Sequence, residues 1–188
     1  MGQIVLFHSV YGLRPAVWAA ADRLRAAGHQ VVTPDLYGLP PVDTVEEGFS
    51  LLAEVGRDAV LDRARTAVRD LPADTVLAGF SLGAGVAGAL LAERPEAAAL
   101  LLLHGTGGAP EAVRPGLPVQ LHLADPDEYE PPHEVDEWQR AMSGAGAELS
   151  VFRYPGPGHL FTDPDLPDHD RASAELAWER VRAFLAGR

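Results

Sequence analysis

The sequence has no cysteine and no lysine among its 188 residues. Without cysteine the chain forms no disulfide, offers no thiolate nucleophile and has no cysteine ligand for zinc. All 15 basic residues are arginines and stand against 27 acidic residues, so the formal net charge is −12. Such an acidic chain repels the phosphates of a nucleic acid. These absences exclude disulfide scaffolds and cysteine enzymes, and we expect no nucleic-acid partner.

Long hydrophobic runs are absent as well. No apolar stretch approaches the roughly 18 residues that a membrane-spanning helix needs. The first residues, MGQIVLFHSV, also lack the basic segment of a signal peptide. We therefore expect a cytoplasmic protein that makes no membrane contact. The length suits one domain with a single core, here residues 1–188.

Apolar runs of strand length alternate with segments of helical periodicity. The expected strands are residues 3–9, 29–34, 74–80, 97–105, 119–124 and 147–155. The expected helices are residues 14–28, 45–54, 57–70, 82–95, 133–146 and 168–187. Several strands are apolar throughout, which is typical of a parallel sheet covered by helices on both faces. Right-handed crossovers then predict the strand order 2-1-3-4-5-6, and the segment 35–56 is a candidate for a short lid.

The segment AGFSLGAG places Ser81 between Gly79 and Gly83, after an apolar strand and before an alanine-rich helix. A nucleophilic serine requires this context. A sharp turn between strand and helix exposes the hydroxyl, and the glycines avoid Cβ clashes with neighbouring backbone. The N–H groups that begin the helix then point at the site. A glycine-rich packing turn is the alternative, but we interpret Ser81 as a nucleophile.

A serine hydroxyl needs a base within hydrogen-bonding reach, most often a histidine that a carboxylate orients. In α/β sheets with such a serine turn, the chain order is serine, acid, histidine. The acid is therefore expected after strand 119–124 and the histidine after the last strand. HLADPDEYEPP offers Asp125 and Asp127 at the first place, and YPGPGHLFTD offers His159 at the second.

The other histidines have weaker contexts than His159. His104 and His122 lie in or beside apolar strands, which favours buried structural roles. His8 ends the first strand beside the site, and we expect it to support or pack rather than react. The spacing of the histidines matches no metal-binding motif. We therefore expect no metal and no cofactor.

Five blocks together carry a resemblance to a known family: LFHSVYGLRPAV, HQVVTPDLYG, GFSLGAG, HLADPDEYEPP and YPGPGHLFTD. Their order and spacing resemble those of the dienelactone hydrolase family of α/β-hydrolases, over nearly the whole chain. The resemblance implies a minimal α/β-hydrolase fold, with about six mostly parallel strands flanked by helices on both faces. It also implies hydrolysis of an ester or a lactone.

The resemblance further implies a role for individual residues. Ser81 matches the family's nucleophile, and His159 in GPGHLF matches the base. Asp127 matches the acid, which in the family precedes an aromatic residue and a proline, and Asp125 is the rival. The backbone N–H groups of Leu82 and Val10 match the two donors of the oxyanion hole, which binds the negatively charged oxygen of the intermediate.

The chain departs from the family at three positions. Many members have cysteine where Ser81 stands and a glutamate, which pairs with the resting cysteine, where Ser9 stands. The two changes are consistent, because a serine nucleophile needs no such partner. The family also places an arginine for the substrate carboxylate where Asp163 stands, so we expect neutral short-chain esters or lactones to be preferred. Tyr11 and Arg14 are the candidate substrate-binding residues, although Arg14 can instead pair outside the site.

These residues are compatible with three functions. The first is a serine hydrolase that cleaves a small carboxylic ester or lactone through an acyl-enzyme. The second is a thioesterase or acyltransferase that uses the same three side chains. The third is a non-catalytic α/β-hydrolase-fold protein that binds a ligand, because a fold alone does not set a function. The complete set of Ser81, Asp127 and His159 favours an enzyme, and the sequence carries no signal for an oligomeric state.

Overall fold

A computed structural model describes residues 2–188 and shows a six-stranded sheet. The strands are β1 (Gln3–Phe7), β2 (Gln30–Val32), β3 (Val76–Phe80), β4 (Leu100–Leu103), β5 (Leu117–Asp125) and β6 (Ala147–Pro155). Their order is β2-β1-β3-β4-β5-β6, and each neighbouring pair is parallel. The predicted strand order and the α/β class are confirmed.

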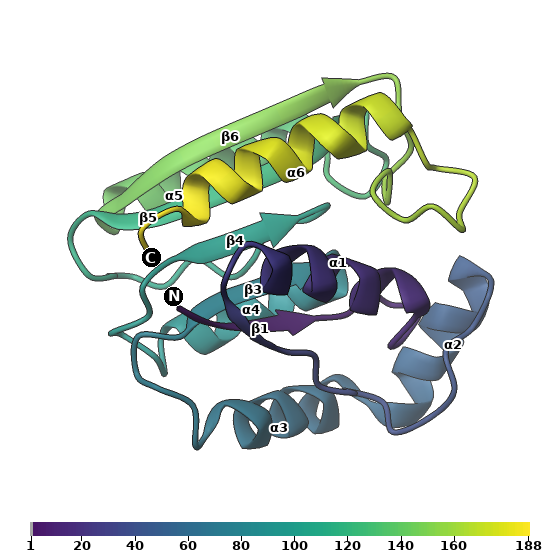
Figure 1. Cartoon of the computed structure of the whole chain (residues 1–188), viewed down its shortest axis with the longest axis horizontal. Helices are drawn as coiled ribbons and strands as arrows, with labels where there is room; N and C mark the ends of the chain where they lie inside the picture. Colours follow the sequence, from purple (N-terminus) through teal and green to yellow (C-terminus); the bar gives the residue numbers. More distant parts are fainter. Residues whose placement is uncertain (1) are drawn as a thin grey trace.

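Helices cover both faces of this sheet. They are α1 (Pro15–Ala26), α2 (Val45–Val55), α3 (Arg57–Val68), α4 (Leu82–Leu91), α5 (Pro132–Gly144) and α6 (Arg171–Leu185). Figure 1 shows α1 and α6 in front of the sheet and α4 and α5 behind it. It also shows α2 at the end of the sheet toward which the strand arrows point. Among residues 2–188, none of the helices has the length and apolarity to cross a membrane.

The two faces of the sheet build two apolar cores. Ile4 and Leu6 pack toward α1 and α6, whereas Val5 and Phe7, the alternate residues of β1, pack toward α3, α4 and α5. All four side chains are fully buried. Burial on both faces explains why these strands are apolar throughout rather than alternating.

Two local features shape the end of the sheet where the parallel strands terminate. The expected strand 97–105 ends at Leu103, because His104 adopts a φ of 62°, outside the extended region. Helix α2 begins with a capping box, in which the Thr44 hydroxyl accepts from the Glu47 N–H and the Glu47 carboxylate accepts from the Thr44 N–H. The expected lid segment 35–56 therefore contains a helix with a defined start.

Candidate active site

Ser81 occupies a strained turn between β3 and α4. Its φ of 50° and ψ of −107° lie in a region that side chains other than glycine rarely adopt. A Cβ atom at Gly79 would lie 2.1 Å from the Gly83 carbonyl carbon, and one at Gly83 would lie 2.4 Å from the Phe7 carbonyl oxygen. Glycine at both flanks therefore lets β1, β3 and α4 approach closely enough to hold the turn.

The structure brings His159 and Asp127 to Ser81 in one hydrogen-bonded chain. The His159 Nε2 atom lies 2.9 Å from the Ser81 Oγ, and the Nδ1 atom lies 2.9 and 2.8 Å from the two Asp127 carboxylate oxygens. The Asp127 side chain is 1% exposed and that of His159 is 11% exposed. An ionised Asp127 accepts from Nδ1–H, which leaves Nε2 free to accept the Ser81 proton.

The structure also separates the two aspartates that sequence reasoning left as rivals. Asp125 is the exposed last residue of β5, and the hydrogen bonds of the His159 ring go to Asp127 and Ser81 instead. Asp127 accepts from the backbone N–H of Tyr129 as well as from His159. The Tyr129 ring lies 4.8 Å from the His159 ring, centroid to centroid. The loop after β5 thus positions the Asp127 carboxylate and also supplies the aromatic ring that packs beside the His159 imidazole.

A second buried histidine lies behind His159. The ring centroids of His104 and His159 are 6.2 Å apart, and the His104 Nε2 atom lies 2.6 Å from the Thr162 hydroxyl oxygen. Complete burial holds the pKa of His104 well below its usual range. His104 is therefore neutral at neutral pH and does not place a second positive charge beside His159.

The two expected oxyanion donors, the N–H groups of Val10 and Leu82, belong to residues that line the same cavity as Ser81 and His159. Within the described part of the chain, neither N–H donates to a protein acceptor. Leu82 is the first residue of α4, where helix geometry leaves the N–H without a partner. Both donors are therefore available to a bound ligand.

The cavity beside Ser81 has a volume of about 370 Å³. Tyr11 lines it as expected, and α2 contributes Val45, Phe49 and Leu52. Phe49 is 47% exposed, and its ring lies 6.5 Å, centroid to centroid, from the ring of Tyr129, which also lines the cavity. Sequence reasoning did not identify these α2 residues, because a helix pattern does not say which other loop its exposed residues face.

The charged residues that line the cavity are not the ones expected from the sequence, Asp163 and Arg14. Its lining contains Glu128, Glu130, Asp168 and one cation, Arg57. Glu130 accepts from the N–H of Thr106 and lies 2.9 Å from the Thr106 hydroxyl oxygen, and burial raises the pKa of this carboxyl. No local motif marked the four charged side chains, since they come from two separate loops and the start of α3.

Arg14 and Asp163 lie outside this lining and pair with each other. The Arg14 Nε atom is 3.3 Å from an Asp163 carboxylate oxygen, and Nη1 donates to the Val42 carbonyl oxygen at 3.0 Å. Both side chains are mostly buried in a smaller neighbouring cavity that Ser9 also lines. The structure therefore does not bring Arg14 to the cavity at Ser81, and Asp163 is not a free charge on its rim.

Several aromatic side chains do not line the cavity at Ser81 and lie in the core or on the surface instead. Tyr37, Phe80 and Phe161 are buried, and Trp18 is exposed on α1. Among residues 2–188, no group of three or more histidine, aspartate and glutamate side chains is placed to hold a metal ion.

A strained serine turn after a central parallel strand, with a histidine and a buried aspartate supplied by later loops, defines an α/β-hydrolase. The model of the dienelactone hydrolase family matches residues 2–187 of the chain. A carboxymethylenebutenolidase of Rhodococcus opacus is 28% identical, over 97% of this chain and 79% of its own length.

Solved structures show the same fold. A dienelactone hydrolase-like promiscuous phosphotriesterase from metagenomic libraries has a TM-score of 0.79 at 18% identity, over 99% of this chain and 86% of its own. The esterase PE8 has a TM-score of 0.64 at 20% identity, over 98% and 93% of the two chains. The protein belongs to the dienelactone hydrolase family and is a hydrolase of ester bonds.

Proposed function

We propose that the protein cleaves neutral carboxylic esters or lactones with Ser81 as nucleophile, His159 as base and Asp127 as the residue that orients the histidine. The observation that carries this proposal is the unbroken chain of hydrogen bonds from Ser81 through His159 to Asp127, at a serine turn that opens into a cavity. A serine hydroxyl, a neutral imidazole and an ionised carboxylate in this geometry are the parts that acyl transfer needs.

In the acylation step, the Ser81 oxygen attacks the ester carbonyl carbon while its proton moves to the Nε2 atom of His159. The negative charge that develops on the carbonyl oxygen is stabilised by the N–H groups of Val10 and Leu82, each contributing about 2.7–4 kcal/mol. The imidazolium then donates its proton to the departing alcohol oxygen as the carbon–oxygen bond breaks. Asp127 stabilises the imidazolium, and Ser81 is left acylated.

In the deacylation step, a water molecule takes the place of the alcohol. The Nε2 atom of His159 accepts a proton from this water, whose oxygen attacks the acyl carbon. The second tetrahedral intermediate uses the same two N–H donors and collapses when His159 returns the proton to the Ser81 oxygen. The products are a carboxylic acid and the regenerated serine.

The cavity favours small neutral substrates. A volume of about 370 Å³ is near the lower end of the range for small-molecule sites. Its three carboxylates, Glu128, Glu130 and Asp168, exceed its one arginine, so an anionic substrate meets net repulsion. The expected preference for neutral substrates thus remains a prediction, but it now depends on these carboxylates rather than on Asp163.

Labelling with a fluorophosphonate probe tests the nucleophile directly. We expect the probe to modify Ser81, as located by peptide mass spectrometry, and Ser81→Ala to lose both the label and nearly all turnover of p-nitrophenyl acetate. Ser143→Ala, which changes an exposed serine near the end of α5, should keep both. An unlabelled Ser81, together with no turnover across a panel of neutral esters and lactones, would overturn the proposal and favour a ligand-binding protein.

Product analysis separates hydrolysis from acyl transfer. With an alcohol present as an alternative acceptor, a hydrolase releases mainly the free acid, whereas an acyltransferase forms mainly the new ester. We expect the free acid to dominate, and a dominant new ester would replace the hydrolase proposal with a transferase.

A further inference from the structure

We propose that His8 and Tyr37 are positioning residues that aim the Val10 N–H at the carbonyl oxygen of a bound substrate. We call this pair the Val10 clamp. The inference depends on the proposed function, because it assigns these residues a role in stabilising the oxyanion. Neither side chain lines the cavity at Ser81, and both are fully buried or nearly so. They act through the backbone of residues 9 and 10.

The first contact of the clamp is on the peptide bond that carries the Val10 N–H. The His8 Nδ1 atom lies 2.7 Å from the Ser9 carbonyl oxygen, which also accepts from the Gly12 N–H at 3.1 Å. In a trans peptide the carbonyl and the following N–H point in opposite directions. Holding the Ser9 carbonyl on one side therefore sets the direction of the Val10 N–H on the other.

The second contact holds the next peptide bond. The Tyr37 hydroxyl donates to the Val10 carbonyl oxygen at 3.1 Å. Burial raises the pKa of Tyr37 to about 12, so the hydroxyl keeps its proton and remains a donor. With the carbonyls of Ser9 and Val10 both bonded, the two peptide planes on either side of the Val10 Cα atom are fixed.

The ring of His8 is set in the tautomer that this role needs. The Leu36 N–H donates to its Nε2 atom at 3.0 Å, so Nε2 is the acceptor and Nδ1 carries the proton that goes to Ser9. Burial lowers the pKa of His8, which keeps the ring neutral. The Tyr37 ring meets the His8 ring edge-on, with centroids 5.0 Å apart.

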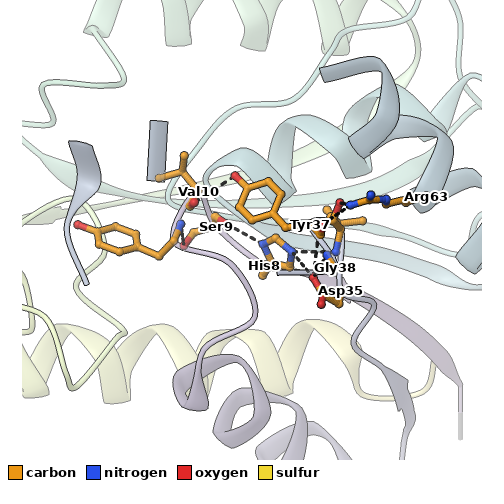
Figure 2. A network of polar contacts seen from close by, with 9 residues as sticks. His8, Ser9, Val10, Asp35, Tyr37, Gly38 and Arg63 are labelled. Atoms are coloured by element: carbon orange, nitrogen blue, oxygen red, sulfur yellow. Dashed lines mark hydrogen bonds and ion pairs between the residues drawn. The ribbon is translucent and has the colours of Figure 1, made fainter. Parts of the chain in front are cut away.

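The segment that supplies Tyr37 is itself fixed, as Figure 2 shows. One Asp35 carboxylate oxygen accepts from the N–H groups of Tyr37 and Gly38, both at 2.9 Å. The Arg63 Nη1 atom donates to the Leu36 carbonyl oxygen at 2.9 Å and contacts the Tyr37 carbonyl oxygen. The turn after β2 thus forms a rigid support for the loop after β1.

A catalytic effect distinguishes the Val10 clamp from a merely structural contact. A donor that has lost its direction weakens the transition state but leaves the bound substrate nearly unchanged, so the loss should appear in kcat and not in KM. Acylation and deacylation both pass through an oxyanion, so kcat falls whichever step limits turnover. The pH profile should keep its shape, because His159 is untouched.

The decisive variant is Tyr37→Phe, which removes one oxygen atom and keeps the ring. We expect kcat on p-nitrophenyl acetate to fall roughly tenfold, less than the 10²–10³ lost when a donor is removed. KM should stay within about twofold. The inhibition constant of a trifluoromethyl ketone, whose adduct with Ser81 carries an oxyanion, should rise by about the same factor as kcat falls.

Tyr154→Phe is the matched control, since Tyr154 is also buried and its hydroxyl also contacts a buried histidine, His122. This control should lose stability without a change in kcat. An unchanged kcat in Tyr37→Phe, a loss confined to KM, or an equal loss of kcat in Tyr154→Phe would each overturn the Val10 clamp.

His8 provides an independent comparison. His8→Asn places an amide N–H near the Nδ1 position, whereas His8→Leu has similar bulk and no donor. We expect Asn to retain several times more kcat than Leu at equal KM, and equal kcat values in two folded variants would count against the clamp. If Ser81→Ala remains active, the proposed serine mechanism is wrong, and the Val10 clamp, which depends on it, is wrong as well. If Ser81→Ala is inactive and Tyr37→Phe is normal, only the Val10 clamp fails.

Discussion

Two buried tyrosine–histidine pairs lie on opposite sides of the sheet centre, and their hydrogen bonds end in different places. On the β1–β2 side, His8 bonds the Ser9 carbonyl and Tyr37 bonds the Val10 carbonyl. On the β5–β6 side, the His122 Nδ1 atom lies 2.8 Å from the Tyr154 hydroxyl, so this pair bonds to itself.

The difference shows that the destination of a buried hydrogen bond matters more than the residue types that form it. A pair that bonds main-chain carbonyls in a loop at the site transmits a change to that loop. A pair that closes on itself between β5 and β6 satisfies its own polar atoms, and the remaining His122 nitrogen, Nε2, donates to the Gln120 amide oxygen at 2.9 Å. Its loss should be felt in stability alone.

On the β5–β6 side, we expect Asp127 to affect the catalytic rate and the His122–Tyr154 pair not to affect it. Asp127→Asn should lower kcat about 10⁴-fold, because the amide no longer holds His159 in the required tautomer. Steady-state kinetics with p-nitrophenyl acetate measures this directly. Asp125→Asn is the control two residues away, with an exposed side chain that should leave kcat nearly unchanged. The reverse order of the two variants would make Asp125 the acid.

Both histidine pairs should make the fold sensitive to acid. Burial lowers the pKa of His122 to about 3 and that of His8 in the same direction, so the folded protein binds fewer protons than the unfolded chain. This contribution to stability is complete above the unfolded value of about 6.5 and is lost as the pH falls toward the folded value. For His122 the loss is about 1.4 kcal/mol per pH unit.

Urea unfolding at pH 7, 5.5 and 4.5 checks this slope. His122→Gln should remove the contribution of that residue, so its free energy of unfolding should fall less steeply than that of the wild type. The acidic residues titrate in both proteins, and the comparison cancels their effect to first order. Parallel slopes for the two proteins would mean that His122 does not remain neutral in the folded state.

Tyr154→Phe should reduce the free energy of unfolding by about 1–3 kcal/mol, because it leaves a buried His122 nitrogen without its partner. Denaturant unfolding followed by circular dichroism gives this value, and kcat measured in parallel should stay within about twofold of the wild type. A large fall in kcat with little change in stability would show that the His122–Tyr154 pair acts on catalysis as the His8–Tyr37 pair is expected to do, and the proposed difference between them would be wrong.

The smallest expected effect concerns substrate charge. An exposed like-charge contact costs about 1 kcal/mol, so kcat/KM for a neutral lactone should exceed that for its carboxylated analogue about fivefold. Glu128→Gln, which removes one charge from the cavity lining, should narrow this ratio. Glu134→Gln, on the exposed face of α5, should not change it. A wild-type preference for the anionic lactone would instead point to Arg57 as its binding residue.

Much of the fold could be predicted because its signals are local or repetitive. Apolar strands such as residues 76–80 alternate with helices of 3.6-residue period, and the right-handed crossover then leaves few arrangements of the sheet. Parallel strands end at the same edge, so residues that follow β3, β5 and β6 were expected to meet. This reasoning identified Ser81 as the nucleophile and His159 as the base, but it could not decide whether Asp125 or Asp127 is the acid.

Patterns along the chain were sufficient to predict the strand order, the α/β class and the segments that form the site. Three contacts could be seen only in the folded protein: Arg14 pairs with Asp163, Phe49 of α2 lines the cavity, and Tyr37 donates to the Val10 carbonyl 27 residues away. Each of these contacts joins segments that follow different elements. Which side chains meet there depends on how the crossovers stack and which rotamers fit, and no periodicity in the sequence encodes that.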